Sequence, residues 1–279
     1  MKQVLAILLF FLMVTPALAA DQKESTYDSV MRTNTLRCGY VVWPPEFSKD
    51  PNTGKMSGMA YDIVMELARR LSLKIEWTEE VNFGNMIEGL NQDRYNMVCF
   101  TSYRESNHMR FVNFSNPVYY TGSGVFVRAD DARFDGRDYA VFNDPKIIIS
   151  TMDGEMSAII ADDQFPKAKT TALPQNSDFA SLLLNVANGK ADVTFADIAA
   201  ARKFMMENPG QLKDISAGNP IRLWSHGFIY KKGDYDWSQT VNLVLAEMQE
   251  QGFTGRVLTK YKDYQGAFLP VAKPYEASK

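Results

Sequence analysis

The 279-residue sequence contains only two histidines and two cysteines. A zinc site with Cys and His ligands would use nearly all of them, and neither a CxxC nor an HExxH spacing occurs. We therefore expect no cofactor and no dedicated metalloenzyme centre, although a site made only of carboxylates stays open.

The chain also has no excess of basic residues. The net charge is −3, so the chain is not expected to bind nucleic acid, whose phosphates need a clustered basic face. Hydrophobic residues make up 46% and charged residues 23%, which is ordinary for a globular protein. The length suits one large domain or two of moderate size.

The first 20 residues have the pattern of an export signal. A short basic start is followed by an apolar run over residues 4–14 and by the small-x-small sequence Ala17-Leu18-Ala19. The run is shorter than the ~20 residues that a membrane-spanning helix needs, and no later stretch is long and apolar enough. We expect cleavage after Ala19 or Ala20 and a soluble mature protein in a bacterial periplasm.

The periplasm permits disulfides, and both cysteines lie in segments that read as buried strands. If the strands of Cys38 and Cys99 are neighbours, a bridge is geometrically possible but strained. The interpretation favoured here is two buried thiols, with the bridge as the alternative.

Strand and helix patterns alternate along the mature chain. A polar, loose lead-in is predicted over residues 21–33. Strands are predicted over 36–42, 73–77, 95–100, 146–150, 168–173, 191–195 and 227–230. Helices are predicted over 61–71, 85–91, 156–161, 178–188, 198–207, 237–251 and 254–261. This order predicts two α/β units with open, mostly parallel sheets and right-handed crossovers, whose ligand-facing loops meet across a cleft.

A series of motifs in this order resembles the periplasmic solute-binding proteins of ABC uptake systems, in the family typified by polar amino-acid binding proteins. The motifs are Leu36-Arg37-Cys38-Gly39, Trp43-Pro44-Pro45, residues 54–58, Tyr61-Asp62-Ile63, residues 114–120, residues 189–193 with Asp197, and the closing helices from Lys232. The resemblance covers about residues 34–264.

The resemblance implies a two-lobed type II periplasmic binding fold that closes around its ligand. Lobe 1 would comprise residues 34–118 and 226–265, and lobe 2 residues 123–221. A two-strand hinge would lie near residues 119–122 and 220–225. The implied partners are a small-molecule ligand and an ABC transporter permease in the inner membrane, and we expect a monomer.

The family holds a ligand carboxylate with an Arg of the first lobe and with helix-start amides of the second, and an ammonium with an Asp. In this chain His108 stands at the Arg position, so a permanent two-pronged clamp is lost; Arg104 and Arg110 lie nearby as possible substitutes. Glu155 and Met156 stand at the helix start, which is therefore acidic. Asp197 stands at the position of the ammonium-binding Asp, and it also suits the N-cap of the helix that follows.

Aromatic residues gather at the remaining matched positions, where core packing is their alternative role. The predicted ligand contacts of this kind are Trp43, Phe83, Phe100, Tyr103 and Tyr119, with Thr101 as a hydrogen-bond donor. Aromatic faces beside a carboxylate suit organic cations.

These expectations favour an importer's receptor for a small amine-bearing or cationic metabolite, an amino acid or a derivative, and not an enzyme. Two alternatives stay open. One is a dehydratase-like periplasmic enzyme with Glu155 or Asp197 as acid and His108 as base. The other is a periplasmic accessory protein without a role in transport.

Overall fold

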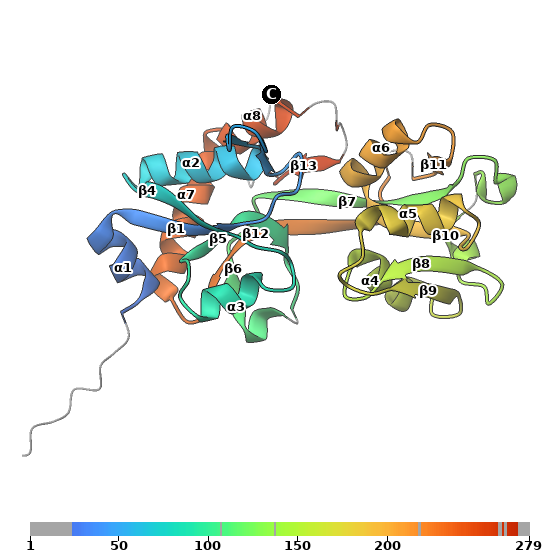
Figure 1. Ribbon diagram of the computed structural model, residues 1–279, viewed down its shortest axis with the longest axis horizontal. Helices are drawn as coiled ribbons and strands as arrows, with labels where there is room; N and C mark the ends of the chain where they lie inside the picture. Colours follow the sequence, from blue (N-terminus) through green and yellow to red (C-terminus); the bar gives the residue numbers. More distant parts are fainter. Residues whose placement is uncertain are drawn as a thin grey trace, which may run out of the picture.

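The computed structural model describes residues 24–106, 108–136, 138–216, 219–261, 264 and 267–272, so the expected export signal lies outside the described residues. Two α/β units lie side by side and are joined by two long strands (Figure 1). The predicted fold class is confirmed: a mixed central sheet is flanked by helices in each unit.

The first unit is built on β1, which pairs in parallel with β4 and β5. Its strands are β1 (Thr35–Tyr40), β2 (Ser48–Lys49), β3 (Met56–Ser57), β4 (Lys74–Glu80), β5 (Met97–Tyr103) and β6 (Val112–Phe114). Its helices are α1 (Thr26–Thr33), α2 (Met59–Arg70), α3 (Met86–Asn91), the 3₁₀ turn η1 (His108–Arg110), α7 (Tyr235–Glu250) and α8 (Phe253–Thr259).

Helix α1 corrects the prediction of a loose lead-in over residues 21–33. The Ser25 side chain accepts a hydrogen bond from the Asp28 amide at 3.0 Å, which caps the helix start. Val30 is buried in the core of the first unit. Polar composition concealed this helix because only one of its faces touches the core.

The second unit repeats the arrangement around β8, which pairs in parallel with β9 and β10. Its strands are β8 (Ile148–Met152), β9 (Lys169–Leu173), β10 (Val193–Asp197) and β11 (Leu212–Asp214). Its helices are α4 (Met156–Gln164), α5 (Phe179–Ala187), α6 (Ile198–Glu207) and the 3₁₀ turns η2 (Ala132–Phe134) and η3 (Tyr139–Phe142).

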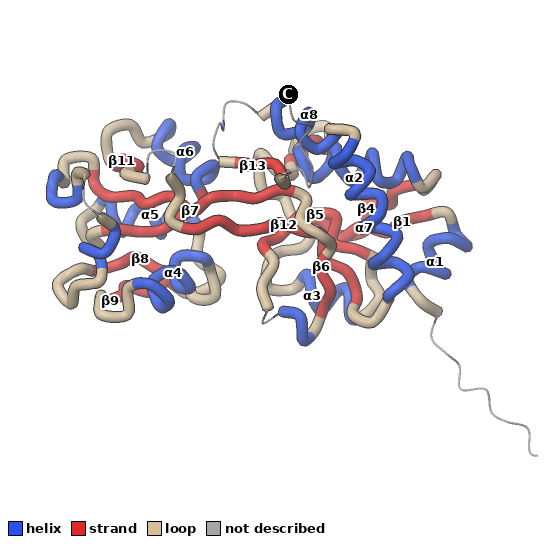
Figure 2. The backbone as a smooth tube through the Cα atoms, turned by 180° about the vertical axis from the view of Figure 1, so that it is seen from behind, coloured by secondary structure: helices blue, strands red, loops and turns tan. Residues whose placement is uncertain are grey.

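Two ten-residue antiparallel strands, β7 (Tyr119–Arg128) and β12 (Arg222–Lys231), run from one unit into the other (Figure 2). β12 pairs with β5 in the first unit, and β7 pairs with β10 in the second. The main strands of both units therefore form one pairing path, β4-β1-β5-β12-β7-β10-β8-β9, while β2 and β3 pair with each other in a small separate sheet. The short strand β13 (Phe268–Pro270) also pairs with β7. The lobe and hinge boundaries stay predictions.

Each unit has its own apolar core. In the first unit, α2 and α7 contribute Ile63, Val64 and Val241 to a cluster with residues of β1, β5 and β12. In the second unit, Ile160 of α4 packs with residues of β7, β8 and β10, such as Phe195. None of the helices in the described ranges is both long and apolar enough to cross a membrane.

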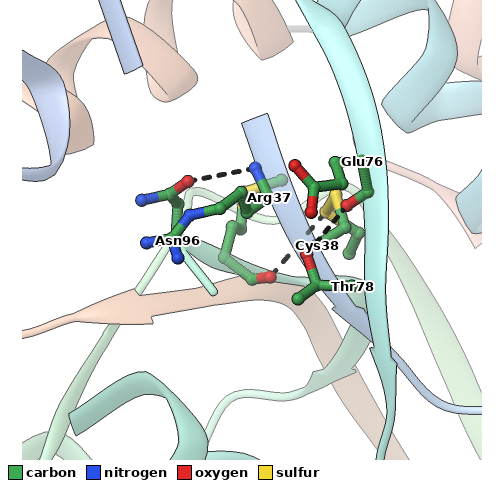
Figure 3. Close-up of a disulfide and its surroundings, with 7 residues drawn as sticks. Arg37, Cys38, Glu76, Thr78 and Asn96 are labelled. Carbon is green, nitrogen blue, oxygen red and sulfur yellow. Dashed lines mark hydrogen bonds between the residues drawn. A yellow bond between two sulfur atoms is a disulfide. The ribbon is translucent and has the colours of Figure 1, made fainter. Parts of the chain in front are cut away.

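A disulfide joins Cys38 of β1 to Cys99 of β5, with 5.4 Å between the two Cα atoms. The prediction of two buried thiols is wrong, and the alternative holds because these strands are direct neighbours in the sheet. Figure 3 shows the bridge beside Asn96, whose side-chain oxygen accepts a hydrogen bond from the Arg37 amide at 3.0 Å. The spacing of the two cysteines could not show which strands would pair.

Reduction of this disulfide is expected to lower the free energy of unfolding by about 4 kcal/mol, because the bridge closes a long loop in the unfolded chain. The two cysteines are separated by 61 residues. Urea unfolding with and without dithiothreitol measures the effect. In the Cys38→Ala/Cys99→Ala variant the reductant should change nothing, and equal midpoints for the oxidised and reduced wild-type protein would contradict the prediction.

Candidate functional site

A pocket of about 160 Å³ opens between the two units, at the carboxyl ends of strands from both units. The first unit contributes Trp43, Glu46, Phe83, Phe100, Thr101, Ser102, Tyr103 and His226 of β12. The second unit contributes Met152, Asp153, Gly154, Glu155, Met156, Gln175, Ser177, Phe179 and Asp197. A ligand here would touch both units at once.

The aromatic side of the pocket centres on Trp43. Its ring meets Phe83 of the same unit edge-on, with 5.6 Å between centroids, and Phe179 at the start of α5 in the other unit, at 5.8 Å. Phe100 continues this wall at 5.9 Å from Phe83. Two backbone hydrogen bonds with Phe47, of 2.8 and 3.0 Å, hold Trp43 in its tight loop.

Tyr103 makes a second contact between the units. Its ring packs edge-on against Trp224, 5.7 Å away, and its hydroxyl donates to the Gly154 carbonyl at 3.4 Å. Burial raises the pKa of this phenol well above its ordinary value, so it stays a neutral donor.

Four residues with carboxyl groups line the pocket: Glu46, Asp153, Glu155 and Asp197. Asp197 accepts a hydrogen bond from the Ala200 amide at 2.9 Å and so caps α6. Burial nevertheless raises its pKa to about 6, against the opposing effect of the backbone amides. Burial also raises the pKa of Glu155 and, together with the nearby Asp197 charge, raises that of Glu46 well above its ordinary value.

The N-terminus of α4 is capped by Glu155 itself. Its Oε2 accepts from the Ser157 amide at 2.8 Å and from the Ser157 hydroxyl at 2.6 Å. The amide that could have received a ligand anion therefore already has a carboxylate partner within the chain.

Glu46 is held rigidly at the base of the pocket, with 4% of its surface exposed. Its carbonyl accepts from the Ala60 amide at 2.9 Å. A side chain at Gly58 would collide with that carbonyl, and Gly58 also has φ +130°, so glycine is required for α2 to begin here.

His226, a residue of β12, lies beside Glu46. Its Nε2 is 2.9 Å from the Thr121 hydroxyl, and its ring stacks on Tyr119 with 5.3 Å between centroids. Burial lowers the pKa of His226 to about 4, so the imidazole is neutral at physiological pH. Its Nδ1 is 4.0 Å from Glu46 Oε1.

The structure brings most of the sequence-predicted residues to this pocket. Those that line it are Trp43, Phe83, Phe100, Thr101, Tyr103, Glu155, Met156 and Asp197. Asp197 both lines the pocket and caps the N-terminus of α6, the two roles considered for it from the sequence. Whether these residues bind a ligand stays a prediction.

Two predicted residues lie elsewhere. His108 is in the turn η1, with its Nδ1 3.6 Å from Glu105 Oε2, and it does not line the pocket. Tyr119 is fully buried behind the pocket floor, where its hydroxyl is hydrogen-bonded to Thr101. Arg104 and Arg110 are exposed and do not line the pocket either.

Sequence reasoning missed Glu46, Phe179 and His226. Glu46 directly follows Pro44-Pro45 in a loop already expected to face the cleft, so its position was a usable indication. His226 gave none, because its spatial neighbours Tyr119 and Thr121 are more than a hundred positions away in the chain. Within the described residues no group of His, Cys, Asp and Glu is arranged to hold a metal ion.

Comparison with known proteins agrees with this two-unit architecture. Residues 36–264 match the family of bacterial extracellular solute-binding proteins, family 3. The chain belongs to this family.

One family 3 relative is the L-cystine-binding protein TcyA of Bacillus subtilis (strain 168), which is 25% identical over 84% of this chain and 83% of its own length. A probable histidine-binding protein of Campylobacter jejuni subsp. jejuni serotype O:2 (strain ATCC 700819 / NCTC 11168) is 22% identical, covering 82% of this chain and 86% of its own. Among solved structures, the ancestral amino acid-binding protein AncCDT-1, described as a precursor of cyclohexadienyl dehydratase, superposes with a TM-score of 0.69. It is 24% identical and covers 85% of this chain and 99% of its own, which shows a shared fold.

Proposed function

We propose that this family 3 protein is the extracytoplasmic substrate-binding protein of an ABC importer. It captures a small amine-bearing or cationic metabolite, an amino acid or a derivative, in the pocket between its two units. The observation that carries this proposal is the pocket itself, where carboxyl groups lie beside aromatic rings contributed by both units. The relatives named for cystine and histidine support an amine-bearing ligand.

The connection between the units supports capture by closure. They are linked by β7 and β12, and the pocket lies where the units face each other. Phe179 of the second unit already packs against Trp43 of the first, so bending of the two strands would open the pocket for the ligand and then restore this contact, which excludes water. The closed form would then dock on a permease of the inner membrane.

The periplasm is the proposed location. The family is described as extracellular, and the Cys38–Cys99 disulfide suits an oxidising compartment. The expected cleavage after Ala19 or Ala20 belongs to the same proposal.

Titration calorimetry with lysine, arginine, histidine, cystine and simple amines tests the proposal on protein freed of co-purified ligand by unfolding and refolding. We expect saturable binding of at least one amine-bearing compound at pH 7.5. Affinity should fall ~10-fold at pH 5.0, because Asp197, with its pKa of about 6, is then mostly protonated and no longer attracts a cation. His226 is neutral at both pH values, so it does not oppose this change.

The pH effect has its own control. In the Asp197→Asn variant the residual affinity should change less between pH 7.5 and 5.0. Absence of heat and of any thermal shift across the whole panel would contradict the proposed function.

A dehydratase-like enzyme is the second candidate. It is favoured by the buried Glu46 and His226 pair and by the structural likeness to AncCDT-1, which is described as a precursor of cyclohexadienyl dehydratase. The general base foreseen for it, His108, lies outside the pocket. Mass spectrometry of a bound ligand after prolonged incubation distinguishes the two functions, because only an enzyme would convert it. Loss of uptake in a deletion strain would argue against a mere accessory role.

A further inference from the structure

Two buried polar atoms at the base of the pocket lack hydrogen-bond partners: Glu46 Oε2 and His226 Nδ1. Glu46 and His226 are only 4% and 6% exposed, and both line the pocket. Buried polar atoms in folded proteins are nearly always paired, so such a pair at the floor of a pocket indicates a missing partner.

The fold holds these two groups in place and leaves one polar atom of each without a partner, although the Tyr119 hydroxyl interacts with the Glu46 carboxyl and the Thr101 backbone with the His226 ring. The Glu46 loop is fixed by the Ala60 amide, and the His226 ring is fixed by Thr121 and by stacking on Tyr119. The 4.0 Å between Glu46 Oε1 and His226 Nδ1 is too long for a hydrogen bond between them.

A donor suits both atoms. Burial and the Asp197 charge raise the pKa of Glu46, and a bound cation would offset this by favouring the carboxylate, which only accepts hydrogen bonds. The imidazole is neutral because burial lowers its pKa to about 4, and when its Nε2 donates to Thr121 its Nδ1 is an acceptor. A cation with several N–H groups satisfies both atoms, whereas a quaternary ammonium has no N–H group.

A ligand carboxylate finds no cationic side chain to pair with among the described lining residues. No lysine or arginine is among the described lining residues. The Ser157 amide at the start of α4 already donates to Glu155. The carboxyl groups of Glu155 and Asp197, when ionised, would repel the carboxylate of a ligand.

We propose that the pocket takes a small organic cation that carries several N–H donors and no carboxylate, a primary amine or a guanidinium, with Glu46 and His226 as its acceptors. This inference rests on the proposed function and specifies its ligand class. It assigns the amine-binding contact to Glu46 and His226 at the base of the pocket, beside Asp197.

Calorimetry with matched compounds tests it: agmatine against arginine, cadaverine against lysine, and choline as the cation without N–H groups. The first compound of each pair should bind at least ~10-fold more tightly than the corresponding amino acid, and cadaverine more tightly than choline. Tighter binding of arginine or lysine would overturn the inference and leave the proposed function standing. Equal binding of choline and cadaverine would overturn the requirement for N–H donors, and no binding of any of the five would contradict both proposals.

The Glu46→Gln variant tests the residue directly. Its affinity for cadaverine should fall ~30-fold, because a buried charged acceptor is replaced by a neutral amide of the same size. Its melting temperature should not fall, since the variant removes a buried charge. Glu76→Gln, an exposed glutamate of β4, is the matched control and should bind like the wild type. Unchanged affinity of Glu46→Gln, with a native circular dichroism spectrum, would overturn the assignment.

Discussion

The Asp197→Asn variant is expected to bind the best amine ligand ~100-fold more weakly than the wild type, a loss of about 3 kcal/mol. Asp197 is a buried carboxylate on the pocket wall, so its charge acts on a ligand cation with little screening by water. The asparagine side chain keeps the size and an oxygen that can accept from the Ala200 amide, so the cap of α6 is retained. Calorimetry at pH 7.5 measures the affinity.

A matched control variant separates the effect of losing the Asp197 charge from the effect of changing a helix cap. Asp178 caps α5 by accepting from the Ala180 amide at 3.0 Å, and it is not among the pocket-lining residues. The Asp178→Asn variant should therefore bind like the wild type. If both variants bind with wild-type affinity, Asp197 does not contribute to cation binding.

The Trp43→Ala variant is expected to lose a similar ~100-fold in affinity. The indole lies between Phe83 and Phe179 and so belongs to the aromatic contact between the two units. Its removal takes away a face for cation–π attraction and leaves the ligand more exposed to water. Calorimetry with the same amine measures the loss, and small-angle scattering shows whether ligand still compacts the protein.

Two further variants test whether the effect of Trp43→Ala comes from loss of an aromatic ring in the pocket. Trp43→Phe keeps an aromatic face and should recover part of the affinity. Tyr235→Ala removes a ring that is 71% exposed and does not line the pocket, so it should bind normally. Equal affinity of Trp43→Ala and wild type would show that the aromatic wall is not part of the binding site.

Local sequence patterns were sufficient to predict most of the helices and strands. Helix α6 has the predicted bounds, Ile198–Glu207, because an N-cap aspartate precedes it and Pro209-Gly210 follows it. Strand β12 was predicted only over its apolar end, 227–230, whereas it begins at Arg222. Its first half mixes polar and apolar side chains and is ordered by pairing with β7, a partner far away in the chain.

For the pocket too, local sequence patterns and contacts between distant segments differ in what they can predict. Residues at the carboxyl ends of strands in an α/β pattern, such as Trp43 and Asp197, line the pocket because these ends of the strands lead to it, and their contact with a ligand stays a prediction. His108 was placed by its alignment with a motif, and the turn η1 keeps it outside the pocket.

The sequence by itself determined the α/β class, the family resemblance and eight of the 17 residues that line the pocket, since these depend on local periodicity and on the order of motifs. Only the tertiary structure decided that Cys38 pairs with Cys99, that Glu155 caps its own helix, and that Glu46 lies beside His226. The disulfide and the Glu46–His226 approach depend on which strands become neighbours, and the cap depends on a side-chain rotamer. The few His and Cys residues exclude a zinc centre of the usual kind, and one of those histidines lies at the base of the pocket.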